Sequence, residues 1–138
     1  MIRKFQSADL EQVLRISRES FSQPWPRSEF EKYFENSLVA EENKKIAGFM
    51  IGVVSENQGV VKLIAVNKEY RGQGIGKSLM EFIFNHFQQK GVKEIQAHTR
   101  IQNESGITFL KSFGFEIIET VKNYYLNGEN AYLMKKKL

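Results

Sequence analysis

The sequence predicts an α/β domain in which about four helices cover a mixed sheet of seven strands. The first observation is length: 138 residues suffice for one sizeable core, and no linker, repeat or low-complexity tract divides residues 1–138. The second is the hydrophobic pattern, which gives the element order β-α-α-β-β-β-α-β-α-β-β. Strands joined by short turns and strands separated by helices together indicate a mixed sheet.

The N-terminal part is predicted to be a strand followed by two helices. Residues 2–5 fit the strand, and Ser7 can cap the first helix. The apolar residues of that helix fall near helical spacing: Leu10, Val13, Leu14 and Ile16. Two prolines then interrupt the chain, and residues 28–34 fit a second, short helix. Its aromatic residues lie on one side: Phe30, Tyr33 and Phe34.

Three strands with polar turns between them follow. The predicted strands are residues 38–40, 46–54 and 60–66, the last rich in β-branched side chains. Polar turns are expected at Asn43-Lys44-Lys45 and at Asn57-Gln58-Gly59.

The hydrophobic period changes after the third of these strands. An amphipathic helix is predicted from Ile75 to its end at Gly91, with His86 on its surface. Its apolar residues recur at helical steps: Ile75, Leu79, Phe82, Ile83 and Phe87. The remaining elements are a strand, a helix and two strands around an Asn127-Gly128 turn: 94–99, 103–113, 115–121 and 131–136.

Composition limits the classes of function. The chain is 41% hydrophobic and 26% charged, as in ordinary soluble domains, and no apolar run approaches the ~20 residues of a membrane helix. We therefore expect no signal peptide and no membrane association. The absence of cysteine excludes disulfides and a cysteine nucleophile and favours a reducing cytoplasm. The net charge of +4 suits an anionic ligand or ribosomal RNA, or is simply a mildly basic surface.

A glycine-rich loop opens the long helix. The segment EYRGQGIGKSLMEFIF (69–84) contains GKS (76–78), which also closes a nucleotide-binding P-loop. The P-loop motif requires a glycine where this chain has Arg71. A dinucleotide fingerprint requires its third glycine where this chain has Lys77 or Leu79. Both motifs therefore fail at a required position.

The physical features of the loop still favour a phosphate ligand. Small residues let the backbone approach a ligand closely, and they alternate here: Gly72, Gly74 and Gly76. The helix that follows has unpaired first N–H groups and a dipole that is positive toward the loop. Arg71, Lys77 and Ser78 add charge and a hydroxyl. We therefore predict a pyrophosphate site; the alternative is a turn that only reverses the chain.

Three segments carry a resemblance to a known family. RGQGIG (71–76) matches the [QR]-x-x-G-x-[GA] signature of the GNAT superfamily of acetyl-CoA-dependent N-acetyltransferases, and NESGITFLKSFGF (103–115) resembles its N-x-x-A-x-x-x-Y-x-x-x-G-F segment. Phe21 with Pro24-Trp25, together with KNYY (122–125) and GENAYLM (128–134), is similar to RimI-type protein N-terminal acetyltransferases. The tail FGFEIIETVKNYY is also similar to NatE-type enzymes. The resemblance spans nearly the whole chain and is weakest at 35–58.

The resemblance implies a GNAT fold with a mostly antiparallel sheet. The strand ending at Val66 would splay from the strand that holds His98, and acetyl-CoA would lie between them as the cosubstrate. The pantetheine would pair with the backbone of Ile64 and Val66 and contact Asn103. The pyrophosphate would lie on the amides of Arg71, Gly72, Gln73, Gly74, Ile75, Gly76 and Lys77. No metal is implied.

The resemblance also places an acceptor entrance on the opposite side. Phe21 and Trp25 on one loop and Tyr124 and Tyr125 on a hairpin would hold the first residues of a peptide by backbone contacts. The alternative for each of these aromatic residues is a role in packing the hairpin.

The catalytic residues match the family only in part. His98 stands where NatE-type enzymes have a histidine and RimI-type enzymes a glutamate, so it resembles the general base, and an ordinary pKa of about 6.5 suits that task. The alternative is a half-buried strand histidine that faces nothing. Leu110 stands where the family has its general-acid tyrosine, and Val60 where NatE-type enzymes have a second tyrosine. A backbone N–H near Val66 could stabilise the oxyanion.

The function predicted from sequence is acetylation of a protein or peptide N-terminus. An α-amino group has a pKa of about 7.7–8.0 and is partly neutral at pH 7, so it needs little help to attack a thioester. The acceptor could be a ribosomal protein, and we expect no specific nucleic acid and a monomer or weak dimer. Two alternatives remain: acetylation of a small amine, and a CoA-binding regulatory module that lost catalysis with Leu110.

Overall fold

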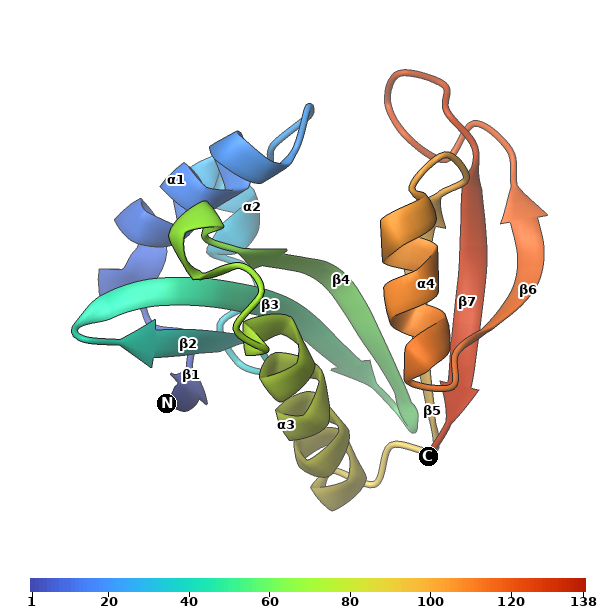
Figure 1. The fold of residues 1–138 in the computed structure, drawn as a ribbon. Helices are drawn as coiled ribbons and strands as arrows, with labels where there is room; N and C mark the ends of the chain where they lie inside the picture. Colours follow the sequence, from blue (N-terminus) through green and yellow to red (C-terminus); the bar gives the residue numbers. More distant parts are fainter.

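The computed structural model describes all residues, 1–138, and contains one seven-stranded sheet (Figure 1). The strands are β1 Ile2–Lys4, β2 Leu38–Glu42, β3 Lys45–Ser55, β4 Gln58–Val66, β5 Glu94–Arg100, β6 Glu116–Val121 and β7 Ala131–Lys137. Their order across the sheet is β1-β2-β3-β4-β5-β7-β6. All neighbours are antiparallel except β4 and β5, which are parallel. The predicted mixed, mostly antiparallel sheet is therefore confirmed.

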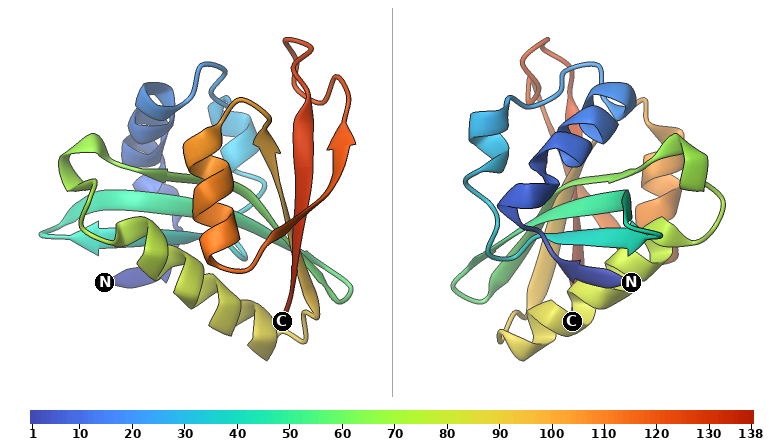
Figure 2. Two further views of the ribbon diagram at one scale, coloured as in Figure 1. Left: turned by 45° about the vertical axis from the view of Figure 1, so that its right-hand side comes forward. Right: turned by 90° about the vertical axis from the view of Figure 1, so that its left-hand side faces the viewer.

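Four α-helices lie on the two faces of this sheet (Figure 2). They are α1 Leu10–Ser20, α2 Arg27–Phe30, α3 Ile75–Gln89 and α4 Glu104–Ser112, and two short 3-10 turns are η1 Ser7–Asp9 and η2 Lys68–Tyr70. One core cluster lies under α1 and α2, with Phe30 and Phe49 at its centre. The other lies under α3 and α4, with Met80 and Phe87 fully buried. β3 is covered on both faces, which explains its nearly continuous apolar run.

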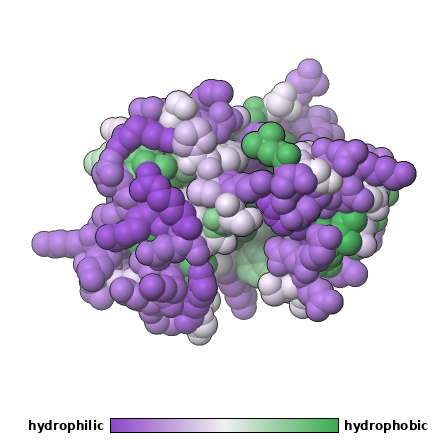
Figure 3. Space-filling view, turned by 90° about the horizontal axis from the view of Figure 1, so that it is seen from above, coloured by the Kyte–Doolittle hydropathy of each residue, from purple (hydrophilic) through white to green (hydrophobic).

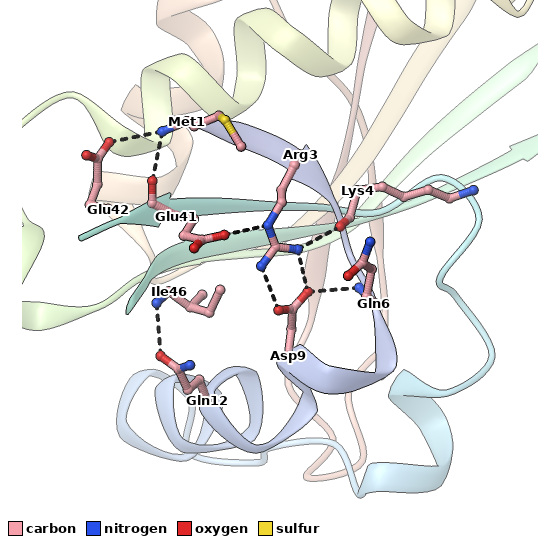
Figure 4. Close-up of polar contacts among 9 residues, drawn as sticks. All are labelled: Met1, Arg3, Lys4, Gln6, Asp9, Gln12, Glu41, Glu42 and Ile46. Carbon is pink, nitrogen blue, oxygen red and sulfur yellow. Dashed lines mark hydrogen bonds and ion pairs between the residues drawn. The ribbon is translucent and has the colours of Figure 1, made fainter. Parts of the chain in front are cut away.

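The N-terminal cap differs from the prediction. Gln6, not Ser7, precedes the first turn, and its backbone N–H donates to Asp9 Oδ2 at 2.9 Å. Arg3 fixes that carboxylate with two donors at 2.8 and 2.9 Å and also donates to Glu41 at 2.6 Å (Figure 4). Burial opposes ionisation of Asp9, but the bonds from Arg3 and Gln6 hold its pKa below the usual range. This ion pair ties β1, η1 and β2 together.

Two other elements differ for reasons of packing. The helix expected at 28–34 is only the short α2, Arg27–Phe30, because the chain bends after it. The bend lets the Phe34 ring pack on the Phe5 ring, with centroids 4.6 Å apart, and the Tyr33 ring on Trp25, with centroids 5.6 Å apart. The turn expected at 57–59 lies at 56–57, and Gly59 is inside β4. A Cβ on Gly59 would come within 2.6 Å of the Phe87 ring, so this glycine allows α3 to approach the sheet.

The long helix confirms the predicted period with one exception. Phe82 is 43% exposed, whereas Met80, which the prediction left out, is fully buried. His86 is half-buried rather than on the surface, and its Nε2 lies 3.0 Å from Asn36 Oδ1. The predicted Asn127-Gly128 turn is present, with the N–H of Gly128 bonded to the Tyr125 carbonyl, but it is the tip of a longer loop and not a tight hairpin.

The two halves of the sheet separate between β4 and β5 (Figures 1 and 2). These strands pair only from Gln58 to Val61 and from Glu94 to Ala97. Beyond that point β4 carries a bulge: Ile51 pairs with Leu63 and Gly52 with Val61, which leaves Lys62 without a partner on β3. A bulge bends its strand, and here the remaining residues of β4 diverge from β5 as the two arms of a V.

Candidate active site

The V between β4 and β5 contains a cleft of about 500 Å³. Its walls are β4, β5, the first turns of α4, the loop around Phe21 and Trp25, and the β6–β7 loop. Seen from the open end of the V, apolar residues are exposed in the hollow between two polar halves (Figure 3). Clefts of this size and apolar character are typical of small-molecule sites.

The glycine-rich loop presents a series of unpaired donors beside this cleft. The first hydrogen bond of α3 runs from Ser78 N to Gly74 O at 3.0 Å, and no backbone N–H from Arg71 to Lys77 has an acceptor in the protein. Gly72 and Gly74 have φ values of +79° and +80°, and nothing lies within 4 Å of a Cβ built on either. Free amides, open space and the positive end of a helix fit a pyrophosphate.

The side chains of the loop take a smaller part in this arrangement. Arg71 Nε donates to the carbonyl of Val66 at 3.2 Å, so its guanidinium folds back onto the end of β4. A Cβ on Gly76 would meet the Phe109 ring at 3.4 Å, which places α4 directly beside the start of α3. The loop therefore offers an anion its backbone amides rather than the Arg71 guanidinium.

The predicted pantetheine contacts lie along the open arm of β4. Ile64 lines the cleft, and the backbone edge from Lys62 to Val66 has no partner on β5. Asn103 also lines the cleft, but its Oδ1 accepts the N–H of Gly106 at 3.0 Å and thereby caps α4. Its amide group is therefore held in place from within the protein.

His98 lies in the cleft on β5 and is stacked on Tyr124. The two rings are 4.2 Å apart and inclined by 10°. Burial, and next the nearby Lys62 ammonium, lower the pKa of His98 below its ordinary value of 6.5, while Glu119 opposes them. The imidazole is therefore neutral at pH 7, as a proton acceptor must be. The alternative that His98 faces nothing is wrong.

The positions of the family's tyrosines are apolar in this cleft. Leu110 is 6% exposed and belongs to the core under α3 and α4, and Val60 lines the cleft from β4. The phenols that do line the cleft are Tyr124 and Tyr125, and burial raises the pKa of both. Their hydroxyls are therefore protonated at neutral pH.

Leu110→Tyr is expected to change the rate by no more than about tenfold, upward if the hydroxyl reaches the thioester sulfur. A CoA thiolate, from a thiol with a pKa of about 8.5, leaves without much help from an acid. Leu110→Phe adds the same ring without the hydroxyl, so it controls for overpacking of the core. Steady-state rates of the two variants separate these effects. A gain much above tenfold in Leu110→Tyr alone would show that the acid limits the parent protein.

Two aromatic groups flank the cleft, one on the side of α1 and α2 and one on the β6–β7 loop. Trp25 contacts Phe30 at 5.3 Å, and it lines the cleft together with Phe21. Tyr125 lies 5.0 Å from Tyr124 on the opposite wall. The structure thus brings all the predicted acceptor residues to one cleft, although Trp25 and Tyr125 also have packing contacts.

Three further residues that line the cleft were not predicted from the sequence. Arg100 lies 3.8 Å over the Tyr125 ring and donates to Glu129 at 2.8 Å. Leu126 is 99% exposed at the tip of the β6–β7 loop. Lys62 projects from the bulge. A signal existed for two of them: Leu126 is an apolar residue in a polar turn, and Lys62 interrupts an apolar strand.

Tyr125→Ala is expected to raise the KM for a peptide acceptor more than the KM for acetyl-CoA. Tyr125 lines the acceptor wall, whereas the free amides lie at the start of α3. Steady-state kinetics with each substrate varied in turn measure both constants. Equal rises in both, with a lower Tm, would indicate instead that the tyrosine only packs against Arg100.

The splayed sheet, the loop of free amides and the imidazole in the cleft define an acyltransferase that uses a coenzyme A thioester. The sequence profile of the acetyltransferase (GNAT) family matches residues 10–115, and the chain belongs to this family. It is therefore an N-acetyltransferase with the GNAT fold, and enzymes of this family use acetyl-CoA.

Individual relatives support the same assignment. The chain is 34% identical over 142 residues to an uncharacterized N-acetyltransferase, MJ1530, of Methanocaldococcus jannaschii, covering 99% of this chain and 91% of that protein. It is 33% identical over 144 residues to N-alpha-acetyltransferase 50 of Danio rerio, covering 94% and 83%. The crystal structure of the ribosomal-protein-S18-alanine N-acetyltransferase from Escherichia coli matches with a TM-score of 0.91 and 26% identity over 99% of this chain and 92% of that one. The predicted relation to RimI-type and NatE-type enzymes is thus confirmed.

Proposed function

We propose that the protein transfers an acetyl group from acetyl-CoA to the α-amino group of a protein or peptide N-terminus. The observation that carries the proposal is the position of His98, in a cleft that has the loop of free amides near one side and two aromatic walls on the other. The activities for which the relatives are named, a ribosomal-protein alanine acetyltransferase among them, agree with this acceptor class. A ribosomal protein in the cytoplasm is the acceptor we propose first.

The cosubstrate would be held mainly by backbone. The free amides from Arg71 to Lys77 would bind the pyrophosphate, and the unpaired edge of β4 at Ile64 and Val66 would bind the pantetheine. Asn103, fixed as the cap of α4, would contact the same arm. When bound, the thioester supplies an activated acetyl group, and no metal is part of the proposal.

The residues around the amine then have simple tasks. His98 accepts the proton that the nitrogen loses as the C–N bond forms, directly or through water. A backbone N–H of β4 near Val66 stabilises the negative charge on the carbonyl oxygen. The C–S bond then breaks and releases the thiolate. Leu110 has no proton to donate, so solvent protonates the thiolate. The aromatic walls orient the peptide so that its amine faces His98.

The charges of the cleft argue against a polyamine acceptor. No aspartate or glutamate lines it, so nothing there would bind additional ammonium groups. A neutral α-amino group needs no such partner, and with a pKa of about 7.7–8.0 it is available near neutral pH. The absence of carboxylates thus favours a peptide N-terminus over a small polyamine.

One assay tests this proposal. Thiol release from acetyl-CoA is measured over a panel of peptides that differ in their first two residues, beside polyamines and free amino acids. We expect kcat/KM for the best peptide to exceed that for every small amine. A small amine as the best acceptor would overturn the proposed acceptor class. Binding of acetyl-CoA without any acetylation would favour the alternative of a regulatory CoA-binding module.

The charge of the protein agrees with such an acceptor. The net charge is +4, which suits an encounter with ribosomal RNA next to a protein substrate.

A further inference from the structure

Lys62 is a positive charge in the acceptor half of the cleft. It belongs to the bulge of β4, where no residue of β3 pairs with it, and its Nζ lies 5.5 Å from the centre of the Tyr33 ring. Tyr33 packs against the core under α1 and α2, whereas the free amides open α3 on the other face of the sheet. Lys62 therefore faces the acceptor side and not the pyrophosphate site.

This ammonium group has no carboxylate partner. The ammonium group of Lys62 forms no side-chain hydrogen bond and no ion pair within the protein. Arg100 is the other permanent cation of the cleft, and Glu129 neutralises it at 2.8 Å. Glu29, on the neighbouring α2, lies within electrostatic range of Lys62, but its carboxylate is held by Lys32 at 3.0 Å and does not line the cleft. Of the two permanent cations that line the cleft, Lys62 is therefore the one without an ion-pair partner.

A cation without an ion-pair partner has an electrostatic effect on a nearby amine site. It repels the ammonium form of an acceptor and any second cation near it, and it attracts a carboxylate. The interruption of the apolar run Val60–Ile64 by this one charged residue has no explanation in packing, because the side chain is exposed. A negative group supplied by the acceptor would complete the site.

We propose that Lys62 selects acceptors with an acidic side chain in their first few residues. This inference rests on the proposed function, since it names the class of peptide that the same cleft acetylates. The carboxylate would lie against the ammonium beside Tyr33, while the α-amino group reaches His98. Free amino acids also carry a carboxylate close to their amine, so the experiment must separate the two sources.

The experiment compares matched peptides on matched variants. Peptides with Asp or Glu at the second or third position are paired with the same peptides carrying Asn or Gln, and free aspartate and glutamate are assayed beside them. For the parent protein we expect kcat/KM to be at least about fivefold higher for the acidic member of a pair, and the ratio to shrink with added salt. Lys62→Met should bring the ratio close to one, and Lys62→Glu should invert it.

Lys93→Met serves as the control. Lys93 is an exposed lysine at the closed end of the V, outside the cleft, so its removal should leave the ratio as in the parent. The ratio within each variant is the decisive quantity, because removal of Lys62 also changes the pKa of His98 and hence the rate with every acceptor. A ratio near one in the parent, or an acidic preference that survives in Lys62→Met, overturns the role of Lys62.

The same measurements distinguish this failure from failure of the proposed function. If neutral and acidic peptides are acetylated equally well, the N-terminal activity stands and only the selection by Lys62 is wrong. If free aspartate or glutamate is a better acceptor than any peptide, the proposed acceptor class falls. A loss of that preference in Lys62→Met would then assign the lysine to the amino acid's own carboxylate and would contradict the peptide proposal.

Discussion

Replacing His98 with alanine is expected to lower kcat/KM at pH 7 by at least about tenfold, since a positioned base typically supplies about 10²–10⁴-fold. His98 lies in the cleft, is stacked on Tyr124 at 4.2 Å, and is neutral because burial and Lys62 lower its pKa. No carboxylate lines the cleft to replace it as a base. The alanine variant must therefore rely on water to accept the amine proton.

The dependence on pH gives this prediction its signature. In the parent protein, activity should fall at acid pH as His98 becomes protonated, at a pH below its ordinary pKa of 6.5. In His98→Ala the loss relative to the parent should shrink toward pH 9, because an α-amino group with a pKa of about 7.7–8.0 is by then already neutral. A pH profile of kcat/KM for both proteins tests the acid loss of the parent and the alkaline recovery of His98→Ala separately.

His86 provides the matched control. It is the other of the two histidines, and its pKa is also lowered, by burial and by Lys90 and Lys4. It lies on α3 against Asn36, outside the cleft. His86→Ala should therefore keep the pH profile of the parent even if the protein is less stable. Full activity of His98→Ala across pH 6–9 would remove the histidine from the mechanism.

The fold could be predicted well because its signals are local. The period of the apolar residues depends only on neighbouring positions, and it located every strand and every long helix. The errors arose where side-chain contacts outside the periodic pattern decide. Residues 31–34 leave the helical path because Phe34 packs on Phe5, which is distant in the sequence. Asp9 becomes the capping carboxylate because Arg3, six residues before it, holds it, and the apolar period gives no sign of that pair.

The glycines also show that a local pattern does not reveal contacts with distant residues. Gly59 lies beside polar residues and resembles a turn, yet its role is to admit the Phe87 ring, which lies far away in the sequence. Gly72 and Gly74 were interpreted correctly as the open part of a loop, because their alternation and the helix that follows are contiguous in the chain. A glycine in a sequence thus indicates that a side chain is not tolerated or not needed. Only the three-dimensional neighbours show whether a turn, a packed ring or open space is the reason.

The candidate site shows the same difference between local and distant signals. The loop of free amides from Arg71 to Lys77 could be predicted from one stretch of sequence, and its role as a pyrophosphate site stays a prediction. The stacking of Tyr124 on His98 could not, because it depends on the register of β5 against β7 and on the path of the β6–β7 loop. The direction of Lys62 depends on a bulge, since a one-residue shift in a strand moves a side chain to the opposite face.

The second large effect is expected at the loop: Gly74→Val should weaken acetyl-CoA binding at least about tenfold, or about 1.4 kcal/mol. The position has a φ of +80°, which costs an ordinary residue about 1–2 kcal/mol. No protein atom lies within 4 Å of a Cβ there, so the side chain meets no protein neighbour. It would instead occupy the space beside the free amides. Calorimetry should show tight binding of acetyl-CoA by the parent protein and no comparable binding of ATP or NAD.

Gly91→Val separates the ligand effect from backbone strain. Gly91 also has a φ of +80°, and nothing lies within 4 Å of its Cβ position, but it follows the other end of α3, away from the free amides. The two variants should therefore lose similar amounts of Tm, while only Gly74→Val loses affinity for acetyl-CoA. Equal losses of affinity would assign the effect to strain, and tight ATP binding without acetyl-CoA binding would overturn the cosubstrate site itself. Selective loss in Gly74→Val would mean that the pyrophosphate lies where the valine side chain stands, against the backbone of the loop.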